Sequence, residues 1–356
     1  MQYPSFNPPW YLRNGLMMTL FIALLGQRLG QHENLPPEPL YQPMILRGAN
    51  HVPIFGWLAP PRSSATPRGT IIGTYGITGT LDNQWFLRLL GRKAFARGYG
   101  VLLFDWRAHG KTAELSPTLT SDGLYEGEDF VHMAAQAKAA GCPPPFWFIG
   151  FSLGGQLALW GVKASQAIAP SLELDISEAD IGGGAVICPN LDSNRSLTYL
   201  MNAPLGRYLE KAIAKELKQL AQRLSDYHPN VFDAEAIART TSIRGFDREL
   251  VIQRLGFSSV SEYYDASSPL PLLPHLKKPT LIIYAADDPM FDPAVITDLE
   301  AACRPNPAID LVLTRYGGHV GYYSSQYGQA QATDPDPWWA WNRILDWCDR
   351  TVQTLI

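Results

Sequence analysis

The sequence has little charge of either sign. Charged residues make up 17% of its 356 residues, and 29 Lys and Arg stand against 33 Asp and Glu, so the formal net charge is −4. A general nucleic-acid-binding protein needs a basic surface, which this balance excludes. Hydrophobic residues account for 46% and aromatic residues for 11% of the chain, and this content favours a folded core over intrinsic disorder. The composition therefore predicts a globular protein with no nucleic-acid partner.

Cysteine is also scarce. The chain has four cysteines, and no two of them form a Cys-x-x-Cys pair: Cys142, Cys188, Cys303 and Cys348. This spacing supports neither a zinc site nor a disulfide framework. We expect buried thiols in a cytoplasmic protein.

Long apolar runs are absent. The longest candidate, residues 16–25, has ten residues, whereas a membrane-spanning helix needs about 20. A signal peptide is not indicated either, because Arg13 is the only charge before the run and no small-residue cleavage site follows it. The run predicts an amphipathic helix packed on the body of the protein. The alternative is an interfacial helix that makes peripheral contact with a membrane or lines an apolar substrate entrance.

The order of predicted elements indicates an α/β fold. Residues 1–40 are rich in Pro and aromatic residues and predict an extended arm around one short helix. Residues 41–46 and 51–58 predict a hairpin. Short apolar strands then alternate with helical stretches such as 85–97 and 127–140, which is typical of a parallel sheet covered on both faces. The expected strands are 69–74, 100–104, 146–149, 184–188, 280–284 and 309–313.

One gap between strands is too long for a simple crossover. The segment from 188 to 280 is polar and helix-prone, especially at 205–224 and 246–255, and contains no strong strand signal. We expect an inserted helical cap over the carboxyl edge of the sheet. The predicted division is an arm of residues 1–40, an α/β core of 41–191 and 275–356, and a cap of 192–274.

The strongest local motif is Gly150-Phe151-Ser152-Leu153-Gly154, which directly follows an apolar strand and precedes a plausible helix. Gly-x-Ser-x-Gly in this context places a serine on a tight strand–turn–helix elbow, where the glycines let strand and helix approach closely. Ser152 is thus a candidate nucleophile, and the Leu153 N–H is a candidate oxyanion donor. The competing interpretation is an ordinary glycine-rich turn.

A serine nucleophile needs a base and an orienting acid, and in this architecture they follow it in the order acid, then His. Of seven histidines, only His319 lies beyond the last apolar strands, in a loop flanked by glycines. The strand 280–284 leads into Asp287-Asp288-Pro289. Two adjacent carboxylates cannot both face one imidazole, so we expect Asp288 to be the acid and Asp287 to cap the turn. A metal site here would lack a histidine or third acid at ligand spacing.

A second oxyanion donor is expected in the loop after an early strand, here residues 75–79, and we assign it to the backbone N–H of Ile77. The glycines of this loop fit neither a phosphate-binding loop nor a dinucleotide-binding pattern. His109 precedes Ser152 in the chain, so we expect a structural role for it.

These motifs make the sequence similar to the α/β-hydrolase superfamily, and more narrowly to its YheT-like branch. The resemblance also rests on the arm segment 6–15 and on the cap segments 241–247 and 256–264. It implies an α/β-hydrolase fold, a mostly parallel twisted sheet flanked by helices with a helical cap, and places Ser152, Asp288 and His319 at the nucleophile, acid and base positions. The branch includes bacterial hydrolases, animal lipid hydrolases and fungal acyltransferases that make medium-chain ethyl esters.

The sequence departs from this pattern on the oxyanion side. Tyr75-Gly76 stands where many relatives have His-Gly, and residues 106–110 differ from the usual loop. Substrate preference is therefore left open by the resemblance.

The function we expect is that of a serine esterase, without metal or organic cofactor, acting on a small-molecule and lipid-like ester with a medium or long acyl chain. Two alternatives remain open from sequence. An acyltransferase would pass the same acyl group to an alcohol, and a non-catalytic protein would bind a ligand on a hydrolase scaffold.

Overall fold

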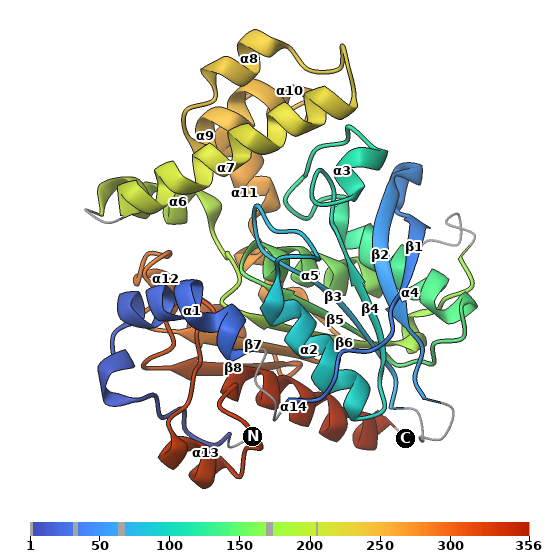
Figure 1. Ribbon diagram of the computed structural model, residues 1–356, viewed down its shortest axis with the longest axis vertical. Helices are drawn as coiled ribbons and strands as arrows, with labels where there is room; N and C mark the ends of the chain where they lie inside the picture. Colours follow the sequence, from blue (N-terminus) through green and yellow to red (C-terminus); the bar gives the residue numbers. More distant parts are fainter. Residues whose placement is uncertain (1–2, 31–34, 63–67, 169–173, 204–205, 356) are drawn as a thin grey trace.

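The computed structural model describes residues 3–30, 35–62, 68–168, 174–203 and 206–355. Its centre is an eight-stranded sheet with the order β1-β2-β4-β3-β5-β6-β7-β8 (Figure 1). β2 runs antiparallel to both of its neighbours, and all pairings from β4 to β8 are parallel. The predicted mostly parallel sheet is thereby confirmed. The strands are β1 (Gln42–Arg47), β2 (Pro53–Ala59), β3 (Thr70–Thr74), β4 (Gly100–Phe104), β5 (Phe146–Phe151), β6 (Ile181–Ile187), β7 (Thr280–Ala285) and β8 (Ile309–Thr314).

The central strands are buried along their whole length, as their uninterrupted apolar sequences predict. Helices cover both faces. Because side chains alternate along a strand, Phe148 and Phe151 of β5 point to opposite faces. Phe148 packs against Phe130 of α4, while Phe151 packs against Phe86 of α2 and Trp341 of α14. The helices outside the segment between β6 and β7 are α1 (Gly15–Leu29), α2 (Trp85–Ala96), α3 (Thr112–Leu115), α4 (Glu126–Ala139), α5 (Leu153–Ala164), α12 (Val295–Cys303), α13 (Gln326–Ala332) and α14 (Trp339–Leu355).

Two strand starts differ from expectation by two or more residues. The second hairpin strand begins at Pro53 rather than His51, because Asn50 and His51 have positive φ angles of 54° and 62°, which no strand accommodates. β6 begins at Ile181 rather than at Gly184. The strand begins with glycines, which are not typical of strands, so the sequence pattern did not indicate this start. A Cβ at Gly182 would lie 2.8 Å from the Trp147 ring, so packing rather than strand propensity sets the sequence there.

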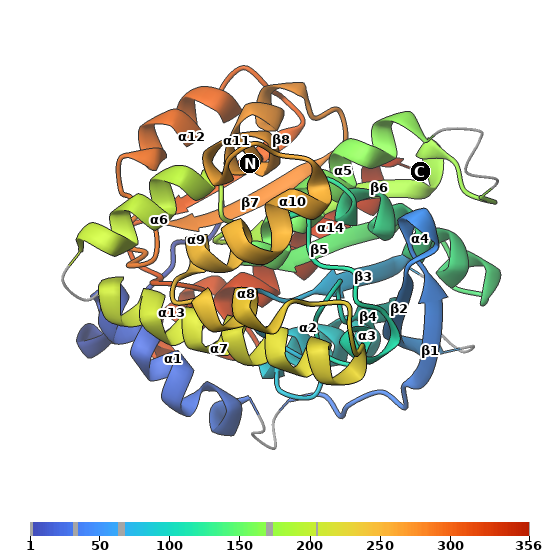
Figure 2. The ribbon, with the colours of Figure 1, turned by 90° about the horizontal axis from the view of Figure 1, so that it is seen from above.

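Between β6 and β7 the described chain forms helices only, and these stand above the carboxyl edge of the sheet (Figures 1 and 2). They enclose a second apolar cluster, which includes Leu217, Leu224, Phe246 and Tyr263. We call these helices the cap, and the predicted division of the chain into arm, core and cap stays a prediction. The helices are α6 (Ser193–Asn202), α7 (Gly206–Tyr227), α8 (Ala234–Arg239), α9 (Ile243–Phe246), a π-helical turn (Asp247–Val251), α10 (Ile252–Leu255) and α11 (Val260–Ser267).

The N-terminal helix α1 is longer than the apolar run that predicted it. The Asn14 side chain accepts a hydrogen bond from the Met17 N–H (3.1 Å) and so caps the first turn. Met18 and Ile22 face inward, whereas Leu24 is 76% exposed. Among the described helices, none is long and apolar enough to cross a membrane. Contact of α1 with a lipid surface stays a prediction.

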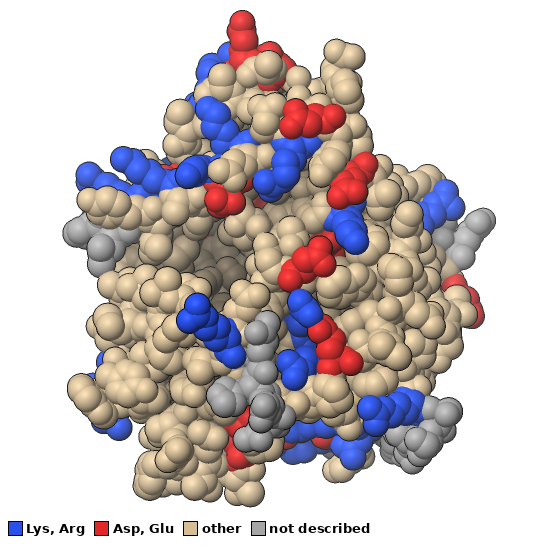
Figure 3. All heavy atoms as spheres, viewed as in Figure 1, with Lys and Arg blue, Asp and Glu red and all other residues tan. Residues whose placement is uncertain are grey.

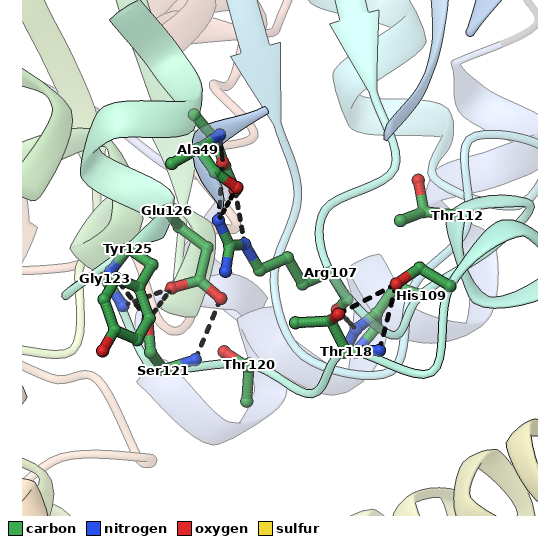
Figure 4. Close-up of polar contacts among 12 residues, drawn as sticks. Ala49, Arg107, His109, Thr112, Thr118, Thr120, Ser121, Gly123, Tyr125 and Glu126 are labelled. Atoms are coloured by element: carbon green, nitrogen blue, oxygen red, sulfur yellow. Dashed lines mark hydrogen bonds and ion pairs between the residues drawn. The ribbon is translucent and has the colours of Figure 1, made fainter. Parts of the chain in front are cut away.

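A buried ion pair ties the hairpin to the loop that follows β4. Arg107 donates to both carboxylate oxygens of Asp129 on α4 (2.7 and 2.8 Å) and to the Ala49 carbonyl (3.1 Å), while Asp129 accepts from the Ala49 N–H (2.7 Å). Close by, the Glu126 carboxylate accepts from the backbone N–H groups of Ser121 (2.9 Å) and Gly123 (3.0 Å) (Figure 4). These contacts fix the loop 119–122 that lies under the cap.

Replacing Asp129 with Ala leaves Arg107 charged and unpaired in the core. We expect the free energy of unfolding to fall by about 3–5 kcal/mol, measured by urea denaturation. The control is Arg248→Gln, which removes a pair whose Arg side chain is 62% exposed and costs about 1 kcal/mol or less. An equal fall in the free energy of unfolding in the two variants would contradict the larger contribution expected of the buried pair.

Candidate active site

Ser152 sits on a strained turn between β5 and α5. Its φ of 54° and ψ of −125° are disfavoured for a residue with a side chain. Neighbouring glycines make the turn sterically feasible: a Cβ at Gly150 would lie 1.9 Å from the Gly154 carbonyl oxygen, and one at Gly154 would lie 2.3 Å from the Tyr75 carbonyl oxygen. The Ser152 N–H donates to the Ile187 carbonyl (3.0 Å), which anchors the turn on β6. The side chain is thereby presented at the carboxyl edge of the sheet.

The structure brings Ser152, His319 and Asp288 together. His319 Nε2 lies 2.8 Å from Ser152 Oγ, and His319 Nδ1 lies 2.9 Å from Asp288 Oδ2. With Nδ1 protonated toward the carboxylate, Nε2 is free to accept the serine proton. The Asp288 side chain is 2% exposed, and its other oxygen accepts from the Met290 N–H (2.9 Å). The carboxylate is therefore held in one orientation against the imidazole.

Asp287 lies beside this chain of contacts and does not face the imidazole. Its Oδ1 accepts from the Gly318 N–H (2.9 Å), so it braces the loop that carries His319. Burial raises the pKa of Asp287 above its ordinary value. Of the two adjacent carboxylates, the geometry places Asp288 on His319 and Asp287 on the loop backbone.

Helix α1 also holds the His319 loop in place. The sequence analysis did not predict this contact. Thr19 Oγ1 accepts from the His319 N–H (2.8 Å) and donates to the Gly15 carbonyl (2.7 Å). Gly15 packs so closely that a Cβ there would lie 1.6 Å from the Asp287 carbonyl oxygen. No local pattern in the sequence signals this contact, because the two segments are separated by 300 residues.

The two predicted oxyanion donors lie beside Ser152. Leu153 is the first residue of α5, a position where N–H groups have no intrahelical acceptor. Ile77 lies in the loop after β3, and in the described chain its N–H has no protein acceptor. This loop runs close to the nucleophile, because a Cβ at Gly76 would lie 3.0 Å from Ser152 Cβ. Both N–H groups are thus available to a ligand.

His109 fixes the loop that carries Ile77. Its Nε2 accepts from the Thr78 N–H (3.1 Å), its Nδ1 lies 2.9 Å from the Arg107 carbonyl oxygen, and its ring stacks on Trp106 at 3.6 Å. Burial lowers the pKa of His109 to about 4, so the ring is neutral at pH 7 and can accept at Nε2. The position agrees with the structural role expected for it.

Asp105 reinforces the same loop. Its carboxylate accepts from the Tyr75 hydroxyl, and also from the N–H groups of Leu81 (2.9 Å) and Lys111 (2.9 Å). Burial raises the pKa of Asp105 to about 6. Tyr75, which departs from the His-Gly pattern, therefore binds a carboxylate beneath the oxyanion loop instead of facing the site.

A cavity opens from Ser152 toward the cap. It holds about 830 Å³ of space, including the part open to solvent. Figure 3 shows the surface hollowed below the cap. Most lining side chains are apolar, and Leu197, Leu200, Leu217 and Phe246 come from cap helices. Asp122 and Asp247 also line it, and burial raises both of their pKa values.

In the part of the chain that the structure describes, no group of three or more His, Cys, Asp or Glu side chains is placed to hold a metal ion. All four cysteines are buried and unpaired.

A strand–turn–helix elbow with its serine beside a histidine, on a sheet with one antiparallel strand near its edge, defines the α/β-hydrolase class. The chain belongs to the alpha/beta hydrolase family, whose sequence model matches residues 76–333. It is 54% identical to a candidate esterase of Synechocystis sp., over 98% of this chain and 95% of that protein.

More distant relatives agree with this assignment. The chain is 24% identical to the candidate esterase YheT of Escherichia coli, over 87% of this chain and 84% of that protein. It is 26% identical to human phospholipase ABHD3, over 72% of this chain and 59% of that protein. A solved structure of the Pyrococcus furiosus esterase Pf2001 matches with a TM-score of 0.55 and 17% identity, over 98% of this chain and 99% of that one, and shows the shared fold. These relatives support a hydrolase function.

The contact between Thr19 and His319 can be tested by stability. Thr19→Val keeps the shape of the side chain but leaves the His319 N–H without an acceptor, so we expect the free energy of unfolding to fall by about 1–3 kcal/mol. Thr19→Ser retains the hydroxyl and serves as the control. Urea denaturation measures both, and a Ser variant as unstable as the Val variant would mean that packing rather than the hydrogen bond matters at this position.

Proposed function

We propose that the protein is a serine esterase that cleaves carboxylic esters through an acyl-enzyme. The observation that carries the proposal is the hydrogen-bonded series Ser152, His319 and Asp288 at the mouth of an apolar cavity. A serine hydroxyl is a weak nucleophile at neutral pH and needs a base within hydrogen-bonding distance. His319 Nε2, 2.8 Å away, supplies it.

In the first half-reaction, Ser152 Oγ attacks the ester carbonyl carbon and His319 Nε2 takes the hydroxyl proton. The carbonyl oxygen becomes an oxyanion that the Ile77 and Leu153 N–H groups bind. When the C–O bond to the alcohol breaks, His319 gives its proton to the departing oxygen. Water then attacks the acyl-enzyme by the same route, and the free acid and Ser152 are regenerated.

Asp288 acts through His319. Its buried carboxylate holds Nδ1–H, keeps Nε2 directed at the serine, and stabilises the imidazolium formed in each half-reaction. Asp287, engaged with the Gly318 N–H, has no comparable contact. The two neighbouring carboxylates therefore differ in function because they differ in partner.

The cavity under the cap supports a lipid-like acyl chain as substrate. Leu, Ile and Phe side chains of α6, α7 and α9 line its cap side. Each methylene that enters such a cavity contributes about 0.8 kcal/mol, or about fourfold in binding. The similarity to a protein named as a phospholipase agrees with this substrate class.

Substitutions of Ser152 and of the two neighbouring carboxylates should show which carboxylate acts on His319. Ser152→Ala should lower kcat for p-nitrophenyl octanoate by about 10³-fold or more, and Asp288→Asn by about 10³–10⁴-fold through the wrong imidazole tautomer. Asp287→Asn is the matched control and should lose much less activity. If Asp287→Asn instead proved the more damaging of the two, the acid would have to be reassigned.

The acyl cavity predicts a chain-length dependence. Across p-nitrophenyl esters from acetate to laurate, assayed below micelle-forming concentrations, kcat/KM should rise by about fourfold for each buried methylene until the cavity is filled. The leaving group is constant in this series, so only the acyl half is tested. A flat or falling series would contradict a lipid-like acyl chain while leaving the triad assignment intact.

A further inference from the structure

A second hollow also reaches Ser152, next to the cap cavity. Its lining includes Thr19, Ile22 and Ala23 of α1 and Trp85 and Phe86 of α2. None of these five residues lines the cap cavity. The two spaces share Ile77, Ser152, Ile213 and Met290. Ser152 therefore stands where two separate apolar spaces meet.

The position of His319 distinguishes the two spaces chemically. His319 and its neighbour Val320 line the second hollow, whereas neither lines the cap cavity. In ester cleavage the alcohol oxygen leaves with the proton of His319 Nε2, so the alcohol half must lie on the histidine side of the serine. The acyl half then extends the other way, past Leu153 and under the cap.

The walls of the second hollow define what kind of alcohol it takes. No Asp, Glu, Lys or Arg lines it among the described residues. Two of its polar side chains make hydrogen bonds within the protein: Thr19 Oγ1 donates to the Gly15 carbonyl, and Gln84 Nε2 donates to Asn83 Oδ1 (2.9 Å). Ile22, Trp85 and Phe86 contribute aliphatic and aromatic surface to the wall. Such a surface gains binding energy from apolar groups only.

The space is also preformed. Helices α1 and α2 are in close contact, because a Cβ at Gly26 would lie 2.3 Å from the Trp85 ring. Trp85 in turn packs on Trp338 and Trp341 at centroid distances of 4.9 and 6.3 Å. The wall formed by α1 lies outside residues 76–333 that match the family model.

From these observations we propose that the hollow between α1 and α2 is the alcohol subsite, which binds an apolar alkyl or aryl alcohol group of the ester. The N-terminal helix thus forms one wall of the substrate site, in addition to holding the His319 loop. The inference rests on the proposed esterase function and adds to it a substrate class: esters in which both the acyl half and the alcohol half are apolar.

Ala23→Trp tests the subsite, because Ala23 is exposed at its edge and a larger side chain there does not enter the core. Two substrates separate the halves of the ester: octyl acetate has a long alcohol, and methyl octanoate has a long acyl chain. The value of kcat/KM reports the acylation step, in which both halves are present. Leu24→Trp, on the neighbouring and 76% exposed position of α1, is the matched control because Leu24 does not line the hollow.

We expect Ala23→Trp to lower kcat/KM for octyl acetate by about tenfold or more, the equivalent of two lost methylene contacts, and to leave methyl octanoate nearly unchanged. Leu24→Trp should alter neither substrate. Loss with methyl octanoate instead, or no change with either substrate, would overturn the assignment of the alcohol subsite. Wild-type protein that hydrolyses neither ester would overturn the esterase function itself, so the two failures are distinguishable.

Discussion

The close approach of three backbone segments around Ser152 is the constraint on which the site depends. The turn after β5, the start of α5 and the loop after β3 meet so tightly that Gly150, Gly154 and Gly76 leave little or no room for a Cβ. Ser152 has a positive φ in this turn, and Ile77 lies in the loop packed beside it. The strain is sustained by the buried parallel sheet beneath it, whose strands β3 and β5 are paired as far as Thr74 and Gly150.

The same edge collects contributions from distant parts of the chain. Asp288 and His319 follow β7 and β8, and parallel pairing through Ala285 and Thr314 brings their loops side by side. Helix α1 then packs across both loops, with Thr19 on the His319 backbone and Gly15 against Asp287. The helix that the sequence predicts on the body of the protein, or at an apolar substrate entrance, therefore supports the loops of the proposed active site.

The sequence predicts well whatever is encoded locally. Apolar runs bounded by glycine identify the buried strands, and the Gly-x-Ser-x-Gly turn places Ser152 between a strand and a helix. Chain order selects His319 and the Asp287–Asp288 pair. Contacts between segments that are distant in the sequence produce no local pattern. Thr19 belongs to no recognisable motif, and the contact between His109 and Thr78 depends on how two loops meet. The start of β6 was missed for a related reason, since its glycines serve the packing of Trp147.

The central claim is that Ser152 forms a covalent acyl-enzyme, and labelling with a fluorophosphonate tests it most directly. The reagent is an electrophile that reacts with activated serines. The folded protein is labelled and then digested, and the modified residue is located by peptide mass spectrometry. The account predicts one adduct per chain, on the peptide that contains Ser152. An adduct on a different residue, or no adduct on a preparation that hydrolyses esters, would contradict it.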